Sequence, residues 1–203
     1  MTKPLFKPAT LDRMEQVVIV VLWAFMTWRA FHSENPFAPL LVLSESAVAL
    51  FVLIRRPTDA ISINPRDWLL ASVATAGPLL INPEDVPLAG LATLGVGLVL
   101  VGNMWQATAK LVLRRSFGIA PANRGVKISG PYRLMRHPMY FGYLLTHIGI
   151  LILMPSLWNL VIYAVAWFAQ IFRLLAEERL LGEDESYRTY QAQVRYRLVP
   201  GVF

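Results

Sequence analysis

One short stretch of the sequence gathers side chains that can hold a charged ligand at the edge of an apolar segment. It reads GPYRLMRHPMYFG over residues 130–142, and a strongly apolar run follows it. Arginine and tyrosine commonly anchor a helix in lipid headgroups, and proline commonly occupies the first helical turn. Glycine allows a ligand or a second backbone to approach closely. The candidate binding residues in this stretch are Tyr132, Arg136, His137, Pro138, Tyr140 and Gly142.

A second stretch supplies carboxylates. The pattern RLLAEE ends another apolar run with Arg173, Glu177 and Glu178, and Arg173 stands one helical turn before Glu177, where the two can pair. Charged groups at this depth are costly unless they are paired or solvated in a cavity. If the two apolar runs form an antiparallel hairpin joined near Pro155, both charged stretches reach the same membrane surface. The sequence therefore predicts one polar pocket that both stretches line.

The elements that must position these residues are membrane helices. Hydrophobic residues make up 56% of the 203 residues and charged residues only 16%, which is far from the average of soluble domains. A bilayer core of about 30 Å requires roughly 17 to 25 apolar residues per helical span. We therefore predict an all-α integral membrane bundle of five to six spans, with a C-terminal cytoplasmic amphipathic helix over the charged segment 177–194. The six apolar runs cover residues 17–31, 37–54, 68–81, 88–113, 139–154 and 157–175.

The distribution of cations predicts the topology of these spans. Lys and Arg precede the first run, separate the second from the third and the fourth from the fifth, and follow the sixth. The loops at residues 32–36, 82–87 and 155–156 contain neither. Because Lys and Arg accumulate in cytoplasmic loops, we expect a multi-pass protein with both termini in the cytoplasm. The net charge of +6 then reflects this bias and attraction to anionic lipid, not binding to nucleic acid.

Several common kinds of site are excluded or disfavoured by the sequence. The chain has no cysteine, which excludes disulfides and thiolate metal sites, and its three histidines lack a metal-binding spacing, so we predict no metal. Gly95, Gly97 and Gly102 do not form a nucleotide-binding fingerprint and favour close helix packing instead. No internal repeat or long polar linker divides the chain. We expect one membrane domain over residues 1–203, with N-terminal spans at 1–87 and a functional core at 88–203.

Polar residues inside the apolar runs have two possible roles each. Glu45 either faces a cavity and functions there or hydrogen-bonds within the bundle beside its neighbouring serines. Asn103, Gln106 and Lys110 share one helical face because they are three and four residues apart. This stripe either lines a cytoplasm-facing cavity or emerges into the headgroups, with Lys110 extending its ammonium group to water.

The charged stretches resemble the isoprenylcysteine carboxyl methyltransferase family of integral membrane enzymes and its prokaryotic relatives. The resemblance covers about residues 95–203. Its most specific parts are G-P-Y-R-x-x-R-H-P-x-Y-x-G at 130–142, R-x-x-x-E-E at 173–178 and Y-x-x-Y-x-x-x-V at 187–194.

The resemblance implies transfer of a methyl group from S-adenosyl-L-methionine to a lipophilic acceptor, with membrane lipids as the surroundings. This cofactor carries a carboxylate, an ammonium group and a sulfonium, so its pocket needs a cation, an anion and aromatic walls. The implied catalytic pair is Arg173 and Glu177, with Arg173 orienting the acceptor. The acceptor is an isoprenylcysteine-like carboxylate, a phospholipid amine or another lipid. The implied cofactor-binding residues are Tyr132, Arg136, His137, Pro138, Tyr140, Gly142, Glu178, Tyr187 and Tyr190.

Two alternatives remain from the sequence. The tail VRYRLVP also resembles the ending of membrane sterol reductases, so a related fold that reduces a sterol-like or enone lipid with NADPH is the first alternative. A reductase is expected to carry Asn in place of Pro138. The second alternative is a membrane protein without enzymatic activity, such as a transporter subunit, for which polar residues are expected in several spans and not at one surface.

Overall fold

The computed structural model describes residues 8–54, 64–84, 86–113 and 126–203, and over these ranges the chain is helical, without a strand. The all-α prediction is therefore confirmed. Two 3₁₀ turns, η1 (Gly77–Leu80) and η3 (Gly130–Arg133), accompany the α-helices. The α-helices of the described ranges are α1 (Pro8–Phe31), α2 (Pro39–Ile54), α3 (Pro65–Ala76), α4 (Ala92–Leu113), α5 (Pro138–Leu153), α6 (Leu157–Leu181) and α7 (Glu185–Gln193).

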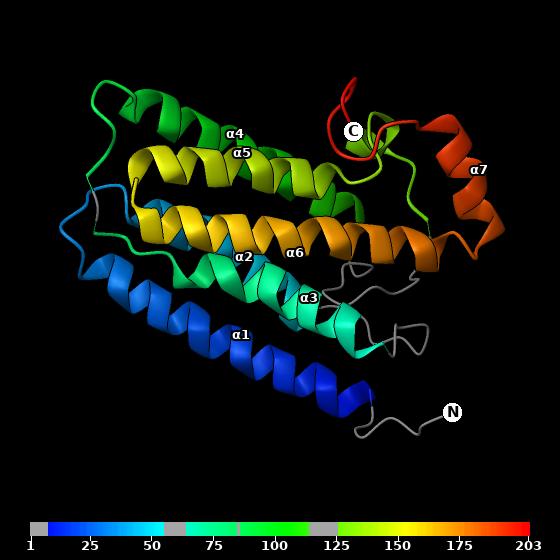
Figure 1. Cartoon of the computed structure of the whole chain (residues 1–203), viewed down its shortest axis with the longest axis horizontal. Helices are drawn as coiled ribbons and strands as arrows, with labels where there is room; N and C mark the ends of the chain where they lie inside the picture. The colour runs from blue at the N-terminus through cyan, green and yellow to red at the C-terminus, as the bar shows by residue number, and fades with distance from the viewer. Residues whose placement is uncertain (1–7, 55–63, 85, 114–125) are drawn as a thin grey trace.

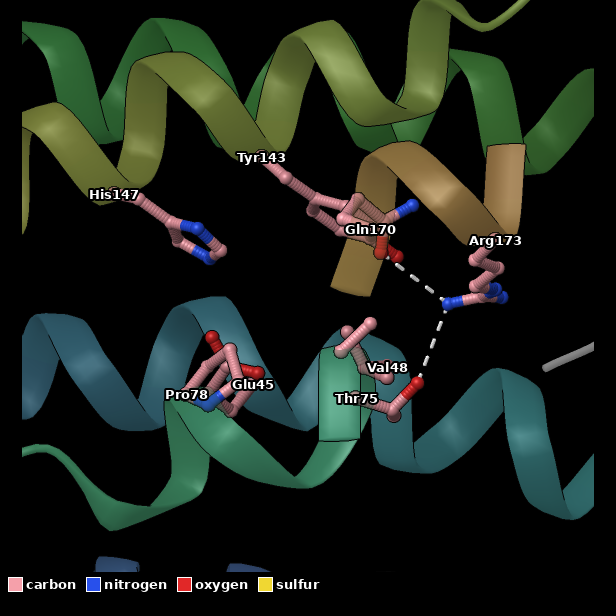
Figure 2. Close-up of a pocket in the computed structure, with 9 residues that line it drawn as sticks. Glu45, Val48, Thr75, Pro78, Tyr143, His147, Gln170 and Arg173 are labelled. Carbon is pink, nitrogen blue, oxygen red and sulfur yellow. Dashed lines mark hydrogen bonds between the residues drawn. The ribbon is translucent and has the colours of Figure 1, made fainter. Parts of the chain in front are cut away.

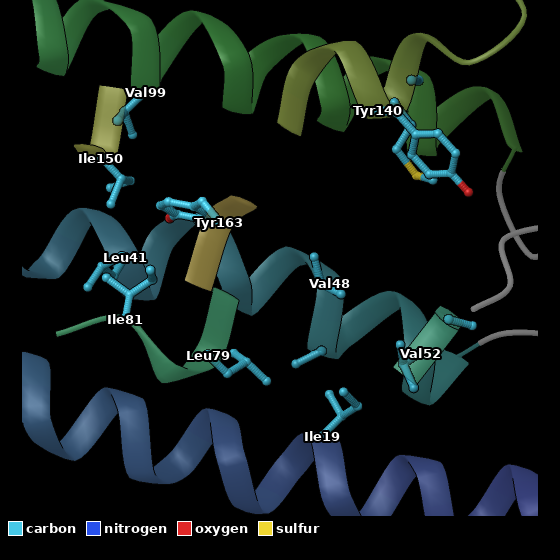
Figure 3. Packing of buried hydrophobic residues seen from close by; sticks show 14 of the residues in the cluster. Ile19, Leu41, Val48, Val52, Leu79, Ile81, Val99, Tyr140, Ile150 and Tyr163 are labelled. Carbon is cyan, nitrogen blue, oxygen red and sulfur yellow. The ribbon is translucent and has the colours of Figure 1, made fainter. Parts of the chain in front are cut away.

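The six longer helices form three closely packed pairs, which are α1 with α2, α3 with α6, and α4 with α5. Figure 1 shows them side by side along the long axis of the molecule, with α7 and the C-terminal segment at one end. The pairing of α3 with α6 is fixed at that end by Arg179, whose guanidinium contacts both carboxylate oxygens of the buried Asp67 at 3.2 and 3.1 Å. Apolar side chains such as Ile19, Val48 and Leu79 fill the space between the layers (Figure 3).

Small residues let α4 and α5 approach each other closely. A methyl group added at Gly102 would lie 2.7 Å from the Gly142 carbonyl oxygen, and one added at Gly95 would lie 3.1 Å from the Gly149 carbonyl oxygen. The predicted packing role is therefore confirmed for Gly95 and Gly102. It is wrong for Gly97, which has open space around its Cα.

Polar side chains tie three loops together at one end of the bundle. The amide of Asn159 donates to the carbonyl oxygens of Asn82 and Met154 at 2.9 and 2.8 Å. Ser33, in the loop after α1, donates through its hydroxyl to the carbonyl oxygen of Pro83 at 2.9 Å. The loops without Lys or Arg thus lie together, as the charge pattern predicts for loops on one side of a membrane.

Two helices of the described ranges, α4 and α6, are long and apolar enough to cross a bilayer by length and composition. Shorter apolar helices lie at Gln16–Phe31 in α1, at α2 and at α5. Many large apolar side chains on their outer surfaces are exposed, among them Phe25, Trp28 and Phe168. Together these features indicate association with a membrane.

The number of spans stays a prediction. The 12-residue helix α3 measures about 18 Å and is too short to cross a bilayer core by itself. Part of the charge pattern lies outside the described residues, namely Lys3, Lys7, Arg55, Arg56, Arg114, Arg115 and Arg124.

The charged segment 177–194 is not one helix, so that prediction is wrong. Helix α6 continues to Leu181, the chain turns through Gly182, and α7 begins at Glu185. The cause is local, because the Asp184 carboxylate accepts a hydrogen bond from the Ser186 backbone amide at 2.8 Å and thereby caps the start of a new helix.

Candidate functional site

The two charged stretches meet at Glu178, at the end of α6. Arg136 Nε donates to Glu178 Oε1 at 2.7 Å, and His137 Nε2 lies 3.3 Å from the same oxygen. The other carboxylate oxygen accepts from Arg197 Nε at 2.7 Å. The side chains of Arg136 and Glu178 are only 8% and 6% exposed, so this ion pair is buried. The predicted convergence of the start of α5 and the end of α6 is confirmed.

The C-terminal segment completes this cluster from a third direction. The backbone amides of Arg136 and His137 donate to the carbonyl oxygens of Tyr196 and Arg197 at 2.9 and 2.8 Å. The first amides of a helix lack partners within the helix, and here the tail supplies acceptors just before α5. Pro138 occupies the first turn of α5, as predicted. Arg197 was not among the predicted residues, although the tail sequence RYR showed that a cation was available there.

Tyr140 connects the cluster around Glu178 with Arg173. Its hydroxyl donates to Glu177 Oε2 at 2.8 Å, and its ring stacks on His137 with centroids 5.4 Å apart and planes 4° apart. The guanidinium carbon of Arg173 lies 5.4 Å from the centre of the same ring. The predicted catalytic residues Arg173 and Glu177 therefore both contact Tyr140, which is almost fully buried. Further hydrogen bonds join Arg173 to Thr75 and Gln170.

Two tyrosines of α7 face this end of the bundle. The Tyr190 hydroxyl donates to the carbonyl oxygen of Tyr132 at 2.7 Å and so holds α7 against η3. Burial raises the pKa of Tyr190 above its usual range, which keeps the hydroxyl protonated as a donor. The Tyr187 hydroxyl is also buried, but it has no hydrogen-bond partner among the described residues. Burial and the Glu178 and Glu177 carboxylates raise the pKa of Tyr187 as well.

Gly142 is placed differently from the other predicted binding residues. It lies roughly 200° around α5 from Tyr140. A methyl group at this position would meet Gln106 on α4 at 2.7 Å. The contact between α4 and α5 accounts for this glycine.

The polar stripe of α4 faces the interior of the bundle. Lys110 is fully buried and donates to Gln106 Oε1 at 2.8 Å, and Gln106 donates to Asn103 Oδ1 at 2.9 Å. Asn103 in turn donates to Ser44 Oγ of α2 at 2.9 Å. Of the two alternatives for this stripe, the one in which Lys110 reaches the headgroups is wrong, because its ammonium group is buried, bonds to Gln106 one helical turn away and lies 5.9 Å from the centre of the Phe51 ring on α2.

A cavity adjoins this stripe, deeper in the bundle than Glu178. It is narrow and has room for about one water molecule. Figure 2 shows its walls, which come from α2, α3, η1, α5 and α6. Arg173 belongs both to this wall and to the cluster around Tyr140. The polar residues that line the cavity are Glu45, Thr75, Tyr143, His147, Gln170 and Arg173.

The fold and this arrangement define a membrane-associated helical protein with a charged site at one end of an apolar bundle. Residues 87–188, half of the chain, match the model of the phospholipid methyltransferase family. The chain belongs to this family, which lies within the isoprenylcysteine carboxyl methyltransferase-type group of membrane methyltransferases. The predicted resemblance is confirmed, and the family implies a methyltransferase. No curated protein matches the chain.

Proposed function

We propose that the protein is an integral membrane methyltransferase that uses S-adenosyl-L-methionine and acts on a lipophilic acceptor. The observation that carries this proposal is the cluster in which Arg136, His137 and the two carboxylates Glu177 and Glu178 lie together beside an apolar bundle. This cluster supplies both signs of charge that a ligand with a carboxylate and an ammonium group requires. Membership of a methyltransferase family supports the same function more strongly than a reductase or a protein without activity.

A second, independent observation indicates that the residues present fit this cofactor. The buried hydroxyl of Tyr187 has no partner among the described residues, and leaving such a group unpaired costs about 1–3 kcal/mol. A ribose hydroxyl or carboxylate of the cofactor would satisfy it. His137 and Arg136 would hold the carboxylate, Glu177 or Glu178 the ammonium group, and Tyr132, Tyr140 and Tyr190 would wall the ligand.

The chemistry requires little of the protein beyond binding and positioning. When bound, S-adenosyl-L-methionine supplies an activated methyl group on its sulfonium. Arg173 would orient the acceptor, because it lies between the Tyr140 cluster and the deeper cavity. The surrounding apolar helices exclude water, which strengthens the interactions that align the reacting groups.

We further propose that the protein is multi-pass with five to six spans and places this site at the cytoplasmic side. The basic residues of η3, the end of α6 and the tail lie at that end of the bundle, opposite the loops joined through Asn82 and Asn159. The cofactor would enter from the cytosol and the acceptor laterally from the lipid. The family description favours a phospholipid, and an isoprenylcysteine-like carboxylate is the other acceptor class.

Calorimetric titration of the detergent-purified protein tests this proposal. We expect S-adenosylhomocysteine to bind and NADP⁺ not to bind. Binding of NADP⁺ without S-adenosylhomocysteine would overturn it.

A matched pair of variants tests the placement of the cofactor. Tyr187→Phe should weaken S-adenosylhomocysteine binding about three- to tenfold without lowering thermal stability, because the lost hydroxyl has no partner among the residues that the structure describes. Tyr196→Phe, at a half-buried position of the tail, serves as the control and should bind normally. Equal affinity of both variants would remove the Tyr187 hydroxyl from the site.

A further inference from the structure

A groove on the outer surface of α4 lies apart from the charged cluster around Glu178. It runs between the second half of α4 and the segment that contains η3, and its volume is about 460 Å³. Figure 1 shows α4 at an edge of the bundle, next to α5. The residues that line the groove include Met104, Trp105, Thr108, Gly130, Pro131 and Leu134.

The walls of this groove are mostly apolar. Met104 and Leu134 are 71% and 56% exposed, so the groove presents apolar surface to the outside of the bundle. The ring of Trp105 packs edge-on against Phe141 of α5, with centroids 5.7 Å apart, and this contact fixes one wall. The α4 residues of the groove span about two helical turns, or roughly 10 Å. A lipid acyl chain matches an apolar groove of this shape on a membrane-associated bundle.

The segment around η3 places cations beside the apolar walls. Gly130 lines the groove, and Arg133 lies on the same face of η3 because side chains three residues apart eclipse in a 3₁₀ turn. Arg133 is exposed, and the exposed Lys127 precedes the turn. The described residues that line the groove include no carboxylate. Cations next to an apolar groove match an anionic phospholipid, which brings a phosphate and acyl chains together.

The opposite side of η3 belongs to the charged cluster. Tyr132 is 6% exposed, and its carbonyl oxygen accepts from the Tyr190 hydroxyl of α7 at 2.7 Å. Shortly after the turn, Arg136 reaches Glu178 at 2.7 Å. The turn therefore lies between the groove and the cluster, and a ligand in the groove contacts η3 without entering the proposed cofactor site.

We propose that this groove binds one anionic phospholipid, whose acyl chain lies along α4 and whose phosphate lies beside Arg133. This lipid is distinct from the methyl acceptor, because Arg173, the residue proposed to orient the acceptor, is 3% exposed inside the bundle. The bound lipid supports η3 from the side opposite Tyr132. The inference goes beyond the proposed methyl transfer and does not depend on it.

Native mass spectrometry of the detergent-purified protein, titrated with dioleoyl phosphatidylglycerol, tests the proposal without cofactor. This lipid is anionic but carries neither an amine nor a carboxylate, so it belongs to neither proposed acceptor class. We expect one bound lipid per protein. Dioleoyl phosphatidylcholine should bind about fivefold more weakly, because one arginine near an anionic headgroup contributes roughly this factor.

Two variants separate the two parts of the lipid. Thr108→Trp fills the groove and should weaken phosphatidylglycerol binding about tenfold, because losing roughly ten close atom contacts corresponds to this factor. Arg133→Gln leaves the groove intact and should weaken binding about fivefold. Leu94→Trp, at an exposed position of α4 outside the groove, is the control for Thr108→Trp, and Arg13→Gln, at an exposed position of α1, is the control for Arg133→Gln. Both controls should bind like the wild type.

Four results would contradict the proposal. Three are equal binding of phosphatidylcholine, unchanged binding by Thr108→Trp, and unchanged binding by Arg133→Gln. The fourth is a dimer that Thr108→Trp dissociates, because a second copy of the chain would then occupy the groove. If Thr108→Trp does not fold, Val101→Trp replaces it, since Val101 is another exposed residue of the groove. Failure to bind S-adenosylhomocysteine would refute the proposed function and leave the lipid result unaffected.

Discussion

The substitution Glu178→Gln should destabilise the protein by about 3–4 kcal/mol, because it leaves the buried Arg136 guanidinium without its counter-charge. Removing one partner of a buried ion pair costs about 3–5 kcal/mol, and the glutamine oxygen retains part of the hydrogen bonding to Arg136. The contact with Arg197 adds at most about 1 kcal/mol, since the Arg197 side chain is 39% exposed and solvent screens its charge. For a chain of this length the loss corresponds to a decrease in Tm of roughly 6–15 °C.

Thermal unfolding in detergent measures this effect, with Glu183→Gln as the control because Glu183 is exposed just beyond the end of α6. Double-mutant cycles then divide the effect between the two arginines. The coupling of Glu178 to Arg136 should be about 2–3 kcal/mol and its coupling to Arg197 below about 1 kcal/mol. If the Glu178→Gln protein melts within about 2 °C of the wild type, the ion pairs of Glu178 do not contribute about 3–4 kcal/mol to the free energy of unfolding.

The remaining predictions concern packing and catalysis. Gly102→Ala should destabilise by about 2–3 kcal/mol in thermal unfolding because its methyl group meets α5, whereas Gly97→Ala should be neutral or slightly stabilising; equal effects would contradict the packing of α4 on α5. Tyr190→Phe should lower Tm by about 2–6 °C, since it removes the hydrogen bonds that hold α7, and an unchanged Tm would refute that anchoring role. Arg173→Ala should abolish methyl transfer, followed with radiolabelled cofactor, while S-adenosylhomocysteine affinity stays nearly unchanged; a collapse of that affinity would place Arg173 in the cofactor site instead.

The convergence of the site was predictable from the sequence, but the orientation of several helices was not. Apolar runs of known length, a short link near Pro155 and charges at the outer ends of both runs require that Arg136 and Glu178 lie at the same end. In contrast, the spacing of Gln106 and Lys110 shows that they share a helical face without showing what that face contacts. The rotation of α4 is determined by glycine contacts with α5, and these depend on the three-dimensional packing.

The end of α6 could have been predicted from local signals. Gly182 and Asp184 are typical of a helix end followed by a new helix start, and they outweigh the continuous charge pattern around them. Arg197 could not be placed in this way, because the tail lacks helical periodicity. Its path depends on hydrogen bonds from the backbone amides of Arg136 and His137, just before α5. The cavity around Glu45 could not be predicted from the sequence either. Its walls come from α2, α3, η1, α5 and α6, and the sequence does not show how these elements pack together.

The contacts of Arg136 also determine when the site can form during synthesis. Glu178 emerges from the ribosome 42 residues after Arg136, and Val194, whose carbonyl oxygen also accepts from Arg136, emerges 58 residues after it. Because synthesis adds roughly 5–20 residues per second, Arg136 lacks these partners for several seconds after it is synthesised. Helices α4 and α5 can pair during this delay through their glycines. A nascent chain that stops before α6 would consequently contain the packed pair α4 and α5 but not yet the cluster around Glu178.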